Sequence, residues 1–110
     1  MACKVEVDPG VCKMKTVVTA KTADDFVSIK FDIESDCPHV RDLAAKIGDV
    51  DPYTTVSAPF PENQIYVCAG QTLPHAACPV PCAMVKAMEV ASGLGLKRDV
   101  VLTITDAPDE

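Results

Sequence analysis

The chain has 110 residues, of which 48% are hydrophobic but only 5% aromatic, and it contains no tryptophan. This length suits a single domain, predicted to span residues 1–110, with a small aliphatic core. Acidic residues exceed basic ones, and the formal net charge is −6. A phosphate-binding surface for DNA or RNA, which needs clustered Lys and Arg, is therefore not expected.

Neither a secretory signal nor a membrane-spanning segment is expected. The opening residues 1–5 lack an apolar stretch, and no later run approaches the length needed to cross a bilayer. A cytoplasmic location is predicted on these grounds. In that reducing compartment, grouped cysteines more often bind metal or do redox work than form disulfides, and the chain has six. In an exported protein the same six would allow three disulfides.

Three strands are expected in the first third of the chain. Cys3, Val5 and Val7 alternate with charged residues, a period-2 pattern that predicts a strand. A second strand, rich in Val and Thr, is predicted over residues 14–20. The third, over 27–34, alternates apolar and polar residues most regularly. One buried face and one wet face are typical of an antiparallel sheet.

Helices are expected after the third strand. The first begins at Cys37-Pro38 and carries one apolar stripe, with Gly48 placed to end it. A short helix at Asp51-Pro52 and another over 61–69 are predicted more weakly. The last helix runs from Pro79 to about residue 92. Its buried face is predicted to contain Val80, Met84, Ala87, Met88 and Ala91.

A final strand is predicted over 99–106, where Val100, Leu102 and Ile104 alternate with Val101, Thr103 and Thr105. The segregation of strands and helices indicates an α+β fold. We expect a small antiparallel sheet of three to four strands with two to three helices packed on one face.

Two Cys-Pro pairs at helix starts are the strongest chemical signal. Proline is favoured at the first helical position, so Cys37 and Cys78 are predicted at or next to the N-caps of their helices. The unpaired N–H groups there are expected to lower the pKa of a thiol and to favour thiolate, the form that binds metals.

Cys12, Cys37 and Cys78 each lie at a junction between predicted elements. A sheet with helices on one face can bring such junctions to one end of the domain, where three thiolates would suit zinc or an iron–sulfur cluster. The fourth ligand is predicted among His75, Cys82 and Asp36. Cys3 and Cys68 are expected in the core instead. No complete catalytic constellation is present, so an enzyme is not favoured.

The order of strands, helices and junction cysteines resembles iron–sulfur cluster assembly scaffolds of the IscU/NifU type. The resemblance covers roughly residues 10–93 and implies that Cys12, Cys37 and Cys78 lie in loops at one end of an IscU/NifU-like fold and bind the metal. The chain departs from the scaffold pattern in two places. It has Lys13-Met14-Lys15 after the first Cys, where the scaffold has an Asp, and Ala77 before the last Cys, where the scaffold has a His.

The motifs Ser35-Asp36-Cys37-Pro38 and Pro74–Pro81 also resemble a family of small uncharacterised prokaryotic proteins. Three functions stay open. The first is a small metal-binding or iron–sulfur carrier module, working with a protein partner or as a homo-oligomer. The second is a thiol redox protein that uses Cys78 and Cys82, four residues apart on one helix. The third is a structural or interaction domain with inert cysteines.

Overall fold

A three-stranded antiparallel sheet forms one layer of the protein. In the computed structural model, which describes residues 1–109, the strands are β1 (Ala2–Val7), β2 (Thr16–Thr22) and β3 (Ile29–Ser35), in the order β1-β2-β3. Val18 of β2 is the partner of Val5 on one side and of Ile33 on the other. The predicted strands are confirmed, with the second and third beginning two residues later than expected.

The sheet has one covered face and one wet face, as the alternation predicts. On the covered face, Val18 and Ala20 are fully buried and Ile29 is 1% exposed. The wet face carries charged, exposed side chains from the two outer strands: Lys4, Glu6, Lys30, Asp32 and Glu34. Burial on a single face fixes the register, because a shift by one residue would turn every apolar side chain towards water.

A tight turn joins β2 and β3. The carboxylate of Asp25 accepts hydrogen bonds from the Ser28 hydroxyl and from the backbone N–H groups of Val27 and Ser28. The Ser28 hydroxyl, followed by these two N–H groups, lowers the pKa of Asp25. The same turn holds Phe26 at a positive φ of 62°, a conformation that the Asp25 hydrogen bonds help to maintain.

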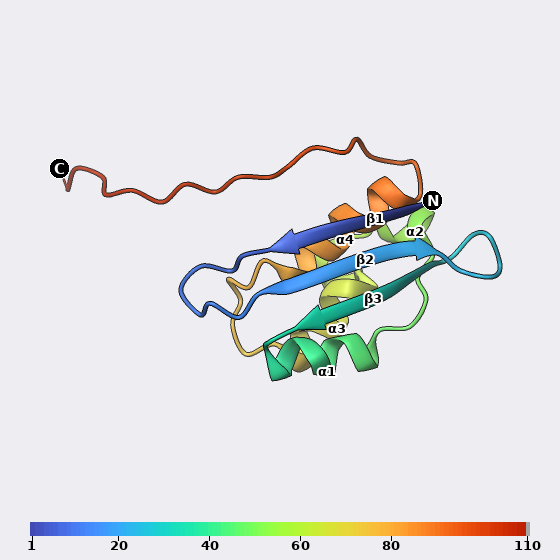
Figure 1. Cartoon of the computed structure of the whole chain (residues 1–110), viewed down its shortest axis with the longest axis horizontal. Helices are drawn as coiled ribbons and strands as arrows, with labels where there is room; N and C mark the ends of the chain where they lie inside the picture. Colours follow the sequence, from blue (N-terminus) through green and yellow to red (C-terminus); the bar gives the residue numbers. More distant parts are fainter. Residues whose placement is uncertain (110) are drawn as a thin grey trace.

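All the helices cover one face of the sheet (Figure 1). They are α1 (Pro38–Lys46), α2 (Pro52–Thr55), the short 3-10 helix η1 (Phe60–Glu62), α3 (Gln64–Thr72) and α4 (Val80–Ala91). Helix α4 packs across β1 and β2, α1 packs beside β3, and α3 lies between α1 and α4. The α+β class is confirmed, with three strands in the sheet.

Helix α4 provides most of the helical core. The predicted buried residues Val80, Met84, Ala87, Met88 and Ala91 are each at most 2% exposed, and Ala83 joins them. The helix ends in a Schellman motif, in which the Gly93 N–H donates to Val90 O and the Leu94 N–H to Glu89 O. Gly93 has a φ of 80° and ends the helix close to the predicted residue 92.

Two helix boundaries differ from the prediction. Helix α3 begins at Gln64, three residues beyond the predicted Pro61, because the side chain of its N-cap Asn63 accepts hydrogen bonds from the Ile65 and Tyr66 N–H groups. Residues 60–62 form η1 instead. Helix α1 ends at Lys46, and its C-cap Ile47 is extended. Gly48 is therefore not the residue that stops it.

The final predicted strand, residues 99–106, is wrong. Within the described part of the chain, residues 96–109 are extended but belong to no sheet and make no backbone hydrogen bond. The alternating pattern is real, but a strand exists only where another strand pairs with it. This segment runs past the body of the domain as a projecting tail (Figure 1), and Leu96 and Ile104 are each 94% exposed.

Other expectations concern the cysteines and the membrane. Cys3 and Cys68 are half-buried and pack against the core, as predicted. All six cysteines are free thiols. Across residues 1–109, the structure shows no helix with the length and apolar character needed to cross a membrane.

Candidate functional site

Three connections meet at one end of the sheet (Figure 1). They are the β1–β2 loop over 8–15, the junction between β3 and α1, and the loop over 73–79 that precedes α4. Strand pairing brings the first two together, because Thr16 is the partner of both Val7 and Ser35. The Asp36 N–H then donates to Lys15 O at 3.1 Å. Each of the three connections carries one of the predicted junction cysteines.

Cys37 is the N-cap of α1, followed by Pro38 at the first helical position, as predicted. Its N–H donates to the Ser35 Oγ at 3.1 Å, and this oxygen lies 2.7 Å from the Thr16 Oγ1. The Arg41 Nη1 donates to Ser35 O at 2.9 Å, which brings a cation close to the junction. Ser35 therefore positions Cys37, a role that the sequence analysis did not assign. The sequence feature that could have indicated this role is a serine two residues before the predicted N-cap.

Cys78 lies next to the N-cap of α4. The N-cap is Pro79 and the helix begins at Val80, one residue later than the prediction that Pro79 would be the first helical residue. The Cys78 N–H donates to His75 O at 3.2 Å, which closes a turn ahead of the helix. Cys78 is half-buried and packs against the core. His75 is exposed, and the turn places it in the same loop as Cys78.

The pKa of the Cys78 thiol is raised, which is opposite to the expected lowering at a helix start. Burial is the main cause, because it disfavours the charged thiolate. The Val80 backbone N–H acts in the other direction, while the negative charges that Cys37 and Cys12 would carry as thiolates raise the pKa further. The helix N-terminus does favour the thiolate as predicted, but desolvation outweighs it.

The three connections place Cys12, Cys37 and Cys78 at the same end of the sheet, where charges on Cys37 and Cys12 would act on the pKa of Cys78. Cys12 is exposed in the β1–β2 loop, where Gly10 and Lys13 both have positive φ. Among residues 1–109, no three Cys, His, Asp or Glu side chains are yet close enough together to hold a metal ion. The cysteines thus converge on one end of the domain without forming a closed ligand set. Asp36 is exposed at the same junction.

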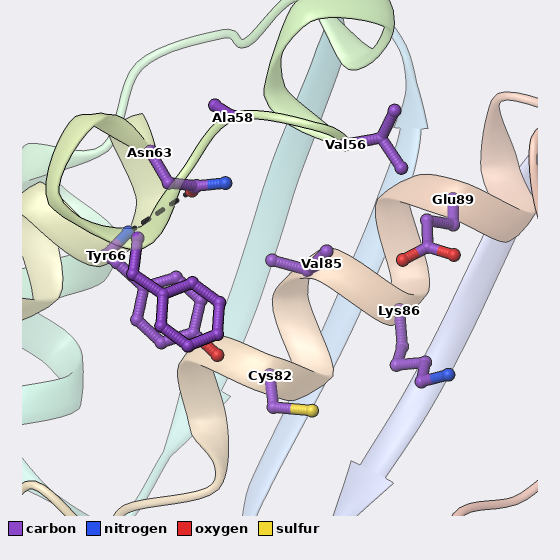
Figure 2. Close-up of a pocket in the computed structure, with 9 residues that line it drawn as sticks. Val56, Ala58, Asn63, Tyr66, Cys82, Val85, Lys86 and Glu89 are labelled. Atoms are coloured by element: carbon purple, nitrogen blue, oxygen red, sulfur yellow. Dashed lines mark hydrogen bonds between the residues drawn. The ribbon is translucent and has the colours of Figure 1, made fainter.

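Cys82 faces a different environment. It lines a groove of about 270 Å³ between α4 and the η1–α3 segment, where it lies close to Tyr66 (Figure 2). Burial raises the pKa of Tyr66, and a charge on Cys82 raises it further. Lys86 and Glu89 lie along the same side of α4 (Figure 2). The groove could not be predicted from the sequence, because it depends on the packing of η1 and α3 against α4.

Comparisons with known proteins identify a family and no activity. No curated protein and no solved structure matches the chain. One family model matches residues 3–104, from β1 to near the end of the tail, and it is described as a family of unknown function (DUF6951). Because this match covers nearly the whole sequence, the chain belongs to the family of unknown function DUF6951.

Proposed function

We propose that the protein binds a thiophilic metal centre, either zinc or an iron–sulfur cluster, through Cys12, Cys37 and Cys78. The observation that carries this proposal is the convergence of the three cysteine-bearing connections at one end of the sheet. Thiolates are the preferred ligands of zinc and of iron–sulfur clusters. Three cysteines on separate elements supply three such ligands from positions far apart in sequence.

The fit of the donor set supports the proposal. Cys37 and Cys78 sit at rigid helix starts, while Cys12 lies on an exposed loop. Coordination would draw the loop over 8–15 inwards, towards the two helix starts. A fourth ligand is available from His75 or Asp36, which belong to the same connections as Cys78 and Cys37. Cys82 would need to turn away from Tyr66 to reach the site.

Nearby basic side chains would offset the negative charge of the proposed metal centre. Three thiolates with a divalent ion leave an excess negative charge, which a protein must offset. Lys13 and Lys15 flank the Cys12 loop, and the Arg41 guanidinium is bonded to Ser35 O, two residues from Cys37. The Lys residues thus stand where the cluster scaffolds have an Asp, and they favour retention of an anionic centre.

The exposure of Cys12 favours a carrier role for the proposed metal centre over a purely structural role. A structural zinc site is closed by four protein ligands, whereas here one of the three cysteines is exposed on a loop. A centre held at the surface of a small domain would be accessible to a partner protein that delivers or receives it. The proposed function is therefore a metal or iron–sulfur carrier.

The test is analysis of the protein purified without oxygen for zinc, iron and sulfide, together with its visible absorption spectrum. Stoichiometric iron and sulfide with charge-transfer bands would support a cluster carrier, and stoichiometric zinc alone would support a zinc site. Protein that contains neither, and that takes up neither zinc nor a reconstituted cluster, would overturn the proposal. Reversible oxidation of Cys78 with Cys82 in that protein would then favour the thiol redox alternative.

A further inference from the structure

The outer edge of β1 is open. The strand order is β1-β2-β3, so β1 and β3 are the two edges of the sheet. The edge of β3 is partly occupied, because Ile29 and Val50 exchange two backbone hydrogen bonds of 2.8 and 3.0 Å. For β1, the hydrogen bonds of residues 1–109 include none on the outer side. Unpaired strand edges are sites where another strand can add.

The C-terminal tail has the pattern of the missing neighbour. Val100, Leu102 and Ile104 alternate with Val101, Thr103 and Thr105, and the three apolar residues are 58%, 82% and 94% exposed. Such a run of exposed large apolar residues is unusual on a protein that works as a monomer. On β1, the inward-facing Cys3 and Val5 are only half-buried, since no further strand covers them.

The topology argues against pairing of the tail with β1 of its own chain. The tail leaves at the end of the domain where β1 begins and runs in the same direction as β1 (Figure 1). Since β1 and β3 are both antiparallel to β2, the tail would also be parallel to β3. In Figure 1 the helices lie behind the sheet, and β3 and the tail lie on opposite sides of it, so the connection from β3 to the far side of β1 would be a left-handed crossover. Such crossovers are almost always right-handed.

The charges argue for an antiparallel partner. Along β1, Lys4 is followed by Glu6 and Asp8, whereas the tail begins with Lys97-Arg98-Asp99, which carries a net positive charge, and ends in Asp106 and Asp109. If the tail ran parallel to β1, its basic end would lie beside the basic end of β1, and its acidic end beside the acidic end of β1. An antiparallel tail brings its basic start towards Glu6 and Asp8 and its acidic end towards Lys4, which is the favourable arrangement across strands. Only a tail from another molecule can approach β1 in this direction.

We infer that two copies of this chain exchange their C-terminal tails, each tail adding as an antiparallel fourth strand to the β1 edge of the other copy. Residues 100–105 align with Ala2–Val7, and Ile104 then lies opposite Cys3 on the helix-covered face. The exchange is reciprocal, as a twofold dimer requires. It uses neither Cys12, Cys37 nor Cys78, so it is independent of the proposed metal centre.

The first test is the mass of the full chain in solution under reducing conditions, measured by light scattering or sedimentation. We expect a dimer that dissociates on dilution. Leu102→Lys should convert it to a monomer, because a charge would enter the shared apolar layer. Thr105→Lys, on the wet face of the added strand and opposite Ala2, is the matched control and should leave the dimer intact. Both variants should keep the circular dichroism of the folded domain, because the tail is outside the core.

A second test fixes the partner strand. After mild oxidation of the Ile104→Cys variant, peptide mapping should find the introduced thiol joined to Cys3, in a product with the mass of two chains. Thr105→Cys, whose thiol would face the other side of the sheet, should give no such link. A monomeric wild type, or a link to Cys3 within a single chain, would overturn the inference. So would a dimer that is unaffected by Leu102→Lys, because it would show that another surface joins the copies.

Discussion

Ser35 illustrates how a single hydroxyl organises the cysteine-bearing end of the sheet. Its Oγ accepts from the Cys37 N–H and is hydrogen-bonded to Thr16 Oγ1, while Thr16 is only 1% exposed. Ser35→Ala should lower the free energy of unfolding by about 1–3 kcal/mol, because the buried Thr16 hydroxyl would lose its partner. Urea denaturation measures this change.

The matched control removes both partners. Thr16→Val keeps the shape of the side chain but not the hydroxyl. In the double variant, Thr16→Val with Ser35→Ala, no buried hydroxyl is left without a hydrogen-bond partner. The loss of unfolding free energy should therefore be smaller than the sum of the losses in the two single variants. Strictly additive costs would show that the two hydroxyl groups do not act as a pair.

The reactivity of Cys78 follows from its raised pKa. The thiolate is the form that alkylates, and burial of Cys78 shifts its formation to higher pH than for an ordinary thiol. In metal-free protein at neutral pH, iodoacetamide should label the exposed Cys12 and Cys82 before Cys78. Labelling of Cys78 should accelerate as the pH is raised above the usual range for cysteine.

Mass spectrometry of timed digests measures these rates. Unfolded protein is the control, in which the three cysteines should react at similar rates. If Cys78 is instead the fastest of the three at neutral pH, a stabilised thiolate must exist at the start of α4. That result would favour the thiol redox function.

At the residue scale, the sequence allowed the helix-start positions of Cys37 and Cys78 to be predicted, because Cys-Pro pairs have a clear local meaning. The direction of the Cys78 pKa shift was not predictable. It depends on how deeply the core buries the thiol, and burial is set by residues distant in sequence. The role of Ser35 was missed for the same reason, since Thr16 lies on another strand.

At the element scale, Asn63 connects two helices. Its side-chain oxygen caps α3, and its Nδ2 donates to Thr55 O at the end of α2 at 2.8 Å. Asn63 is 3% exposed, so water cannot replace these bonds. Asn63→Ala should lower the free energy of unfolding by about 1–3 kcal/mol, from the lost cap and the loss of the shorter of the two hydrogen bonds that Thr55 O accepts. Thermal or urea denaturation measures the loss.

Asn63→Asp separates the two contributions. A carboxylate still accepts from the Ile65 and Tyr66 N–H groups, but it cannot donate to Thr55 O. The Asp variant should therefore be more stable than the Ala variant and less stable than the wild type. Equal stability of the Ala variant and the wild type would contradict the role of Asn63 as a buried cap.

The strands and helices themselves were largely predictable. Period-2 alternation located the first and third strands, the content of Val and Thr located the second, and the apolar stripe of α4 was confirmed residue by residue. The start of α3 was missed because proline at position 61 is a weaker signal than the side-chain cap two residues later. The tail was misassigned because alternation shows that a segment could form a strand, but not that another strand is present for it to pair with.

At the scale of the whole molecule, the order of the elements places the cysteines. Antiparallel pairing brings the β1–β2 loop next to the end of β3, and α4 must begin at that same end to run back across β1 and β2. The meeting of the three cysteine-bearing connections at one end of the sheet was therefore predictable from topology. The groove beside Cys82 was not, because it is formed by η1, α3 and α4 together.

A zinc titration against a chromophoric chelator, with all thiols reduced, tests the central claim most directly. The wild type should bind one zinc ion per chain. Cys12→Ser, Cys37→Ser and Cys78→Ser should each weaken binding by at least about tenfold, since ligand loss costs no less than loss of a group that orients a ligand. Cys82→Ser is the matched control and should bind as the wild type does. If the three variants retain wild-type affinity, these cysteines do not form a metal site.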